Sequence, residues 1–133
     1  MVLQRFVESG GVDYRLFVVG EEVKACVRRT APLGDWRSNA ALGATVEQAV
    51  AAPEWEQVAL RAAHALGLDF AGVDLAVTAQ GPTVLEVNGV PNFRAVFEAT
   101  GKDMARAMAD WVAARPTARV CDGKRRSEWL MAL

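Results

Sequence analysis

The chain has 133 residues, of which 52% are hydrophobic and 23% charged, so it can fold as one domain around a buried core. Its 15 Lys and Arg residues against 16 Asp and Glu residues argue against general binding to nucleic acid or to an anionic membrane. Cys26 and Cys121 form no CxxC pair, which argues against a zinc site or a disulfide framework. No apolar run approaches the roughly 18 residues of a membrane span. We therefore expect a cytoplasmic protein that binds neither nucleic acid nor membrane.

Hydrophobic periodicity predicts strands and helices that alternate along the chain. The expected strands are residues 3–7, 13–19, 23–29, 70–78 and 83–88, and the expected helices are residues 53–66 and a last helix that Asp103 caps and that runs to residue 114. This order predicts an α+β fold in which helices cover one face of a mostly antiparallel sheet. Because a strand begins almost at the first residue, we expect the chain to start inside a larger fold.

Two further segments lack a clear period. Residues 30–43 form a long loop, and loops of this length in compact domains are often functional. Residues 115–133 hold five basic and two acidic residues, and we expect them to form a loosely ordered tail. The predicted organisation is therefore one folded lobe over residues 1–114, followed by this tail.

Three oxygen-bearing side chains lie on the last predicted hairpin. Side chains alternate between the two faces of a strand, so Glu86 and Asn88 share one face. Leu85 and Val87 are expected to point the other way, into the core. If the turn between the two strands centres on Gln80 or Gly81, Asp74 lies opposite the end that holds Glu86 and Asn88, with its side chain on the same face. The sequence therefore predicts that three oxygen ligands converge on a sheet surface.

Oxygen ligands without His or Cys suit Mg²⁺ or Mn²⁺. Because Mg²⁺ usually takes one or two carboxylates and completes its shell with water and substrate phosphates, the trio indicates a metal held together with a nucleotide. The alternative is a hairpin with one polar, solvated face. Asp and Asn are poor strand residues, and this favours the metal site.

Arginines recur near these strands. Arg15 shares a face with Asp13, Arg28 and Arg29 end the next predicted strand, and Arg37 lies in the long loop. Arginine forks match phosphate oxygens, so these side chains are candidates for phosphate binding. The alternative is a surface salt-bridge network with the acidic residues nearby, which are Asp13, Glu21, Glu22 and Asp35.

Together these stretches resemble the C-terminal lobe of the ATP-grasp ligases, in particular the RimK-like α-L-glutamate ligases. The resemblance covers roughly residues 3–114, and its motifs occur in order with fitting spacing. They are Gln4-Arg5-Phe6, Asp13-Tyr14-Arg15, Arg28-Arg29, Gly34-Asp35-Trp36-Arg37-Ser38-Asn39, Ala71-Gly72-Val73-Asp74 and Leu85-Glu86-Val87-Asn88. The resemblance implies an ATP-dependent ligase in which a carboxylate takes the γ-phosphate of ATP, and an amine then displaces phosphate from the acyl phosphate.

The resemblance also implies roles for individual residues. By position, Asp74, Glu86 and Asn88 match the magnesium ligands. The positions that match nucleotide contacts are Arg5 and Phe6 at the hinge beside the adenine, Asp13, and Arg37, Ser38 and Asn39 in the loop that approaches phosphates and metal. Arg37, together with Arg15 and Arg28, is implied to contact phosphate or substrate during catalysis. ATP, Mg²⁺ or Mn²⁺, a carboxylate and an amine are thus the implied ligands.

This sequence departs from the family pattern in several places. Arg5 replaces an acidic hinge residue, residues 40–44 hold only one Gly and no basic residue, and residues 89–94 differ from the commonest form. The first ATP-grasp lobe, with its phosphate-contacting lysines, has no counterpart in these 133 residues. We therefore expect that lobe to be supplied in cis or in trans. The alternatives are a nucleotide- or metal-binding module, or a truncated fragment, without activity of its own.

Overall fold

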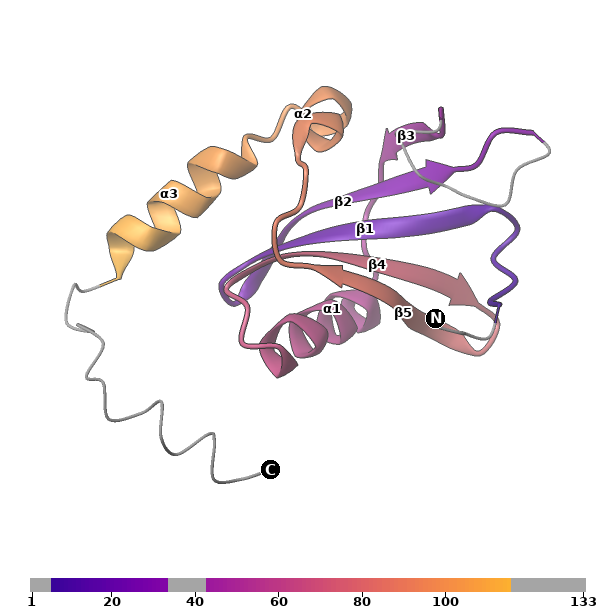
Figure 1. The fold of residues 1–133 in the computed structure, drawn as a ribbon, viewed down its shortest axis with the longest axis horizontal. Coiled ribbons are helices and arrows are strands. Elements are labelled where there is room, and N and C mark those ends of the chain that lie inside the picture. Colours follow the sequence, from indigo (N-terminus) through magenta and orange to yellow (C-terminus); the bar gives the residue numbers. More distant parts are fainter. Residues whose placement is uncertain (1–5, 34–42, 116–133) are drawn as a thin grey trace.

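The computed structural model describes residues 6–33 and 43–115. Five strands form one sheet in the order β3-β2-β1-β4-β5, and every neighbouring pair is antiparallel (Figure 1). The strands are β1 (Val12–Val19), β2 (Glu22–Thr30), β3 (Thr45–Gln48), β4 (Phe70–Thr78) and β5 (Gly81–Asn88), and the helices are α1 (Pro53–Ala65), α2 (Arg94–Thr100) and α3 (Met104–Ala114). The predicted α+β class is confirmed.

The two hairpins and two of the helices follow the local sequence signals. Gly20 and Gly81 adopt positive φ angles of 61° and 102° in the β1–β2 and β4–β5 turns, a conformation that favours glycine. Pro53 opens α1, and the Asp103 side chain accepts a hydrogen bond of 3.0 Å from the Arg106 amide at the start of α3. Among the described residues, no helix is long and apolar enough to span a bilayer.

Three expectations about these elements need correction. β3 and α2 were not predicted, because segments of four and seven residues are too short to show a clear period. Residues 6 and 7 lie outside any strand, and the rest of the strand expected at residues 3–7 falls outside the described residues.

The third correction concerns the helices, which pack on both faces of the sheet (Figure 1). α1 covers the face that holds Leu16, whereas Val96 of α2 and Met104 of α3 pack with Phe17 on the other face. Leu16 and Phe17 are neighbours on β1, so they point to opposite sides, and both are almost fully buried. A strand with two apolar faces needs cover on each of them.

Besides Met104, an aromatic contact holds α3 against the sheet. A side-chain carbon on Gly20 would overlap the Trp111 ring, so the ring lies directly on the backbone of the β1–β2 turn. The Arg115 guanidinium stacks 4.6 Å from the Trp111 ring centre, and its Nη1 lies 2.7 Å from Asp69 Oδ2. The end of α3 is thereby fixed to the start of β4.

We expect Gly20→Ala to lower the free energy of unfolding by more than Gly101→Ala does. Both glycines have similar positive φ angles, of 61° and 69°, so both variants should lose about 1 kcal/mol to backbone strain. No described atom lies within 4 Å of a Cβ at Gly101, so only Gly20→Ala should add about 1–3 kcal/mol from overlap with Trp111. Urea denaturation measures both values, and equal losses would contradict the Trp111 contact.

Candidate functional site

Four charged side chains form a continuous network across β2, β1 and β4. Arg29 donates from Nε and Nη2 to Asp13 Oδ1 and Oδ2, at 2.5 and 2.8 Å. Its Nη2 also lies 2.8 Å from Asp74 Oδ2. Arg15 donates from Nε and Nη2 to Asp74 Oδ1 and Oδ2, at 2.6 and 2.7 Å. We call Asp13, Arg15, Arg29 and Asp74 the four-residue network.

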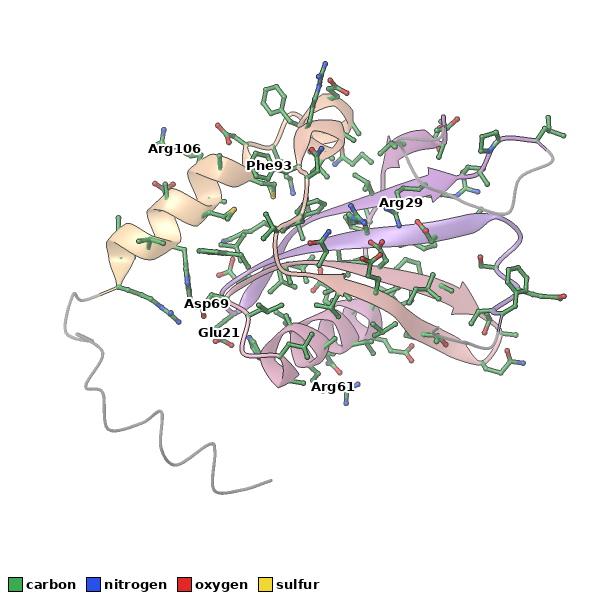
Figure 2. The ribbon with its side chains drawn as sticks, viewed as in Figure 1. Glu21, Arg29, Arg61, Asp69, Phe93 and Arg106 are labelled. Carbon is green, nitrogen blue, oxygen red and sulfur yellow. The ribbon has the colours of Figure 1, made fainter. Side chains whose placement is uncertain are left out.

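The network is buried and electrically balanced. Asp13, Arg29 and Asp74 are only 6%, 6% and 5% exposed, and the two guanidinium groups match the two carboxylates. Burial alone would lower the pKa of Arg29, but the hydrogen bonds that Arg29 donates to Asp13 and the negative charges of Asp74 and Asp13 raise its pKa above the usual value. Arg29 therefore remains a cation. Figure 2 shows its position on β2, beside β1.

The pairing of β4 with β5 adds two polar side chains beside the network. Asp74 pairs with Glu86 and Gly72 pairs with Asn88, so Asp74, Glu86 and Asn88 share one face, as the sequence predicts. Glu86 is exposed, and within residues 6–33 and 43–115 its side chain has no ion pair or hydrogen bond. The Asn88 side-chain oxygen accepts a 2.9 Å hydrogen bond from the Val90 amide, which orients its carboxamide. Glu86 therefore adds a negative charge that the network does not balance.

The side-chain oxygens of Asp74, Glu86 and Asn88 are of the chemical type that binds a hard cation. An ionised carboxylate offers about four acceptor sites, so the three guanidinium contacts to Asp74 leave about one for another partner. No group of three His, Cys, Asp or Glu side chains that could hold a metal occurs in the described ranges, so the set depends on the Asn88 carboxamide. Two carboxylates and one carboxamide suit Mg²⁺ when substrate phosphates complete the coordination shell.

Arg28 lies on the opposite face from the network. It pairs with Tyr14 and Glu47 across the sheet, and its Nη1 lies 3.6 Å from Glu47 Oε2. Tyr14 packs against Trp55 of α1, with ring centroids 4.6 Å apart, so this is the face that α1 covers. The structure therefore brings Arg15 and Asp13 together with Arg29, and not with Arg28.

The sequence made Arg28 and Arg29 both candidates for phosphate binding, and the resemblance implied the role for Arg28. Arg28 and Arg29 are adjacent, so only one of them can share a face with Asp13. Counted from the β1–β2 turn, an unbroken register would pair Asp13 with Arg28. A register shift between Phe17 and Val18 pairs Asp13 with Arg29 instead, and the sequence carries no clear signal for this shift.

Phe6 lies in a groove at the far end of β5. The groove has a volume of about 970 Å³ and is lined by residues 6–8, the β4–β5 turn and Leu85. Phe6 is 62% exposed there. The other nucleotide-contact candidates, Arg5, Arg37, Ser38 and Asn39, lie outside the described residues.

Leu85 corrects another expectation. The register shifts between Asp74 and Leu75, which makes Leu85 the extra residue of a β-bulge on β5. Leu85 is therefore 38% exposed and borders the groove instead of entering the core, whereas Val87 packs against the core as predicted. The bulge places an apolar side chain next to the exposed Glu86.

Comparison with known proteins identifies the family of this chain. The sequence pattern of the RimK-like ATP-grasp domain matches residues 1–112. The chain belongs to the RimK-like ATP-grasp family. It is 40% identical over 121 residues to the ribosomal protein bS6–L-glutamate ligases of Salmonella paratyphi B and Salmonella newport. These residues are 91% of this chain and 40% of each relative, so this RimK-like chain spans about two fifths of their length.

Solved ATP-grasp ligases share the fold of this RimK-like domain. The ligase PsnB, complexed with a phosphomimetic variant of its minimal precursor, Mg and ADP, has a TM-score of 0.62 and 26% sequence identity. The match covers 78% of this chain and 32% of PsnB. The macrocyclase MdnC of Microcystis aeruginosa, bound to precursor peptide MdnA, has a TM-score of 0.59 over 79% of this chain and 34% of MdnC. At 19% identity, MdnC supports the fold alone.

We expect Asp74→Asn and Glu86→Gln to differ sharply in their effect on the stability of the RimK-like domain. Asp74→Asn leaves Arg15 without a carboxylate partner and Arg29 with one, so it should lower the free energy of unfolding by about 3 kcal/mol. Glu86 is exposed, so Glu86→Gln should change it by less than about 0.5 kcal/mol. Urea denaturation of both variants measures the difference, and similar losses would contradict the network.

Proposed function

We propose that residues 1–114 form one wall of the nucleotide site in an ATP- and Mg²⁺-dependent ligase that joins a carboxylate to an amine through an acyl phosphate. One observation supports this most strongly. Asp74, Glu86 and Asn88 share a sheet face with Arg15 and Arg29, in a chain of the RimK-like ATP-grasp family. In this proposal the tail begins after Arg115, which packs against the lobe through Trp111 and Asp69.

Asp74, Glu86 and Asn88 are the proposed ligands of Mg²⁺ or Mn²⁺. When bound, such a cation neutralises charge on phosphate oxygens. Each of the three residues has a distinct task. Asp74 is held by two arginines, Glu86 supplies an exposed and unbalanced charge, and Asn88 presents an amide oxygen that the Val90 amide already orients.

The arginines have two proposed roles. Arg15 and Arg29 hold Asp74 in place and put positive charge beside the metal ligands, where phosphate charge develops during the reaction. Arg37, with Ser38 and Asn39 in the loop after β2, is proposed to contact phosphate by its match to the family motif. The position of Arg28 on the α1 face favours Arg29 over Arg28 for the first role.

The groove beside Phe6 is the proposed site of the adenine. A purine needs apolar walls and nearby backbone donors and acceptors, and the groove combines Phe6 and Leu85 with the backbone of residues 6–8. Leu85 precedes Glu86 on β5, so this one strand would connect the base end of the site to its phosphate end. Asp13, paired with Arg29, is the further proposed nucleotide contact.

The relatives suggest the class of substrate. The Salmonella relatives are L-glutamate ligases of ribosomal protein bS6, and PsnB was solved with its minimal precursor. We propose that this chain takes part in adding glutamate or a similar amino acid to a carboxylate of a peptide or protein in the cytoplasm. The first ATP-grasp lobe would supply the other wall of the site, in cis or in trans.

The first test is a thermal-shift titration with ATP, with and without Mg²⁺, on the wild type and on Glu86→Gln. Ligand at about 100 times Kd stabilises a protein by about 2.7 kcal/mol, which corresponds to a rise in Tm of roughly 5–10 °C for a domain of this size. We expect this rise in the wild type only with Mg²⁺, and we expect Glu86→Gln to lose it while keeping the Tm of the free protein. No Mg²⁺-dependent rise, or an equal rise in the variant, would contradict the proposed metal site.

A second test separates a ligase from a binding module. The chain is mixed with the first lobe of a RimK-like ligase, ATP, Mg²⁺, glutamate and an acceptor peptide, and mass spectrometry measures glutamate addition. We expect addition only when both halves are present. Mg²⁺-dependent ATP binding without any addition or phosphate release would instead assign the chain to the class of binding modules.

A further inference from the structure

Gly72 lies at the centre of the candidate site and has almost no free space around it. It pairs with Phe17 of β1 on one side and with Asn88 of β5 on the other. A Cβ atom on Gly72 would lie 2.8 Å from Pro91 Cβ, and 3.6 and 3.7 Å from Cδ and Nε of Arg15. A separation of 2.8 Å is far below van der Waals contact between carbon atoms, so even an alanine would force Pro91 to move.

Pro91 belongs to the loop that follows Asn88. The loop folds back over β4, because buried Pro91 packs against Gly72, the cross-strand partner of Asn88. Within the same loop, the Val90 amide donates to the Asn88 side-chain oxygen at 2.9 Å. A displacement of Pro91 would therefore also move Val90 and release the Asn88 carboxamide.

Arg15 borders the same space from the other side. Gly72 and Asp74 are two residues apart on β4, so they share a face. The Arg15 side chain passes beside Gly72 before its guanidinium reaches both oxygens of Asp74. Any side chain at position 72 would therefore crowd the Arg15 stem as well as Pro91.

We propose that Gly72 is a positioning residue for the metal ligands, because its missing side chain admits Pro91 and the Arg15 stem together. Gly72 touches neither metal nor substrate. It acts through Asn88, whose carboxamide the Pro91 loop orients, and through Asp74, whose carboxylate Arg15 holds. The inference rests on the proposed function, since it assigns Gly72 to the same metal site.

The test compares Gly72→Ala with Gly89→Ala. Gly89 is the next residue after Asn88, and a Cβ there would meet only the methyl ends of Leu68, at 3.3 and 3.5 Å, which can rotate away. Mn²⁺ alone is titrated into each protein, and the probe is paramagnetic broadening of the Asn88 side-chain NMR signals. We expect Gly72→Ala to weaken Mn²⁺ binding about tenfold, the usual effect of losing support around metal ligands, and Gly89→Ala to leave it unchanged.

A second measurement needs no metal. Hydrogen exchange at the Val90 amide and at Arg15 Nε should become faster in Gly72→Ala and stay slow in Gly89→Ala. If the wild type fails to bind Mn²⁺, the proposed metal site is wrong, and this exchange measurement alone decides the role of Gly72. Wild-type exchange and Mn²⁺ affinity in Gly72→Ala, or equal effects of both substitutions, would overturn the inference.

A compensating variant covers the case in which Gly72→Ala does not fold. Gly72→Ala/Pro91→Gly removes the Pro91 Cβ atom that the new methyl group would strike, and Pro91→Gly alone measures the effect of the loop change. We expect the double variant to fold and to bind Mn²⁺ more tightly than the two single effects would predict. If the losses of Mn²⁺ affinity in the two single variants simply add in the double variant, the contact with Pro91 is not the cause of the weaker binding in Gly72→Ala.

Discussion

Arg29 joins three strands, because its guanidinium binds Asp13 on β1 and Asp74 on β4 from its own place on β2. The candidate site depends on this bridge, because Arg29 helps to hold the Asp74 carboxylate, which the pairing of β4 with β5 sets opposite Glu86. Burying four charges brings little net stability compared with apolar packing of the same volume. Apolar packing of this kind occurs elsewhere on the same face, where Phe17, Ala25 and Val27 pack with Val96 and Met104. Stability alone therefore does not explain why this end of the sheet carries a charged network. The proposed role of the network, to hold Asp74 beside Glu86, does explain it.

The two faces of the sheet consequently serve different purposes. α1 closes one face with a continuous apolar core, whereas α2 and α3 cover only the apolar end of the other (Figure 1). The polar end of that second face holds the network, Glu86 and Asn88. A polar end at which the exposed Glu86 lies beside a buried charged network suits one wall of the proposed nucleotide site. That reading agrees with a chain that spans 40% of the length of its glutamate-ligase relatives.

Much of the fold could be predicted because its signals are local. The period of two in residues 70–78 and 83–88 predicted that Asp74 lies opposite the end of β5 that holds Glu86 and Asn88, and the bulge at Leu85 produces the pairing with Glu86. The helix at residues 53–66 differs from α1 by a single residue, and Asp103 caps α3 as expected. β3 and α2 were missed because they are short and because packing against the sheet, rather than their own sequence, stabilises them.

The sequence by itself determined the chemical type of the site: two carboxylates, a carboxamide and arginines on strands whose alternation puts the oxygen donors on one face. The tertiary structure alone decided which arginine joins them, since Arg28 and Arg29 are adjacent and only the register of β1 with β2 distinguishes them. It also decided that Leu85 leaves the core at a bulge and that Pro91 packs on Gly72. These features depend on register shifts and on contacts between separate strands and loops. The residue pattern along a single strand carries no information about either.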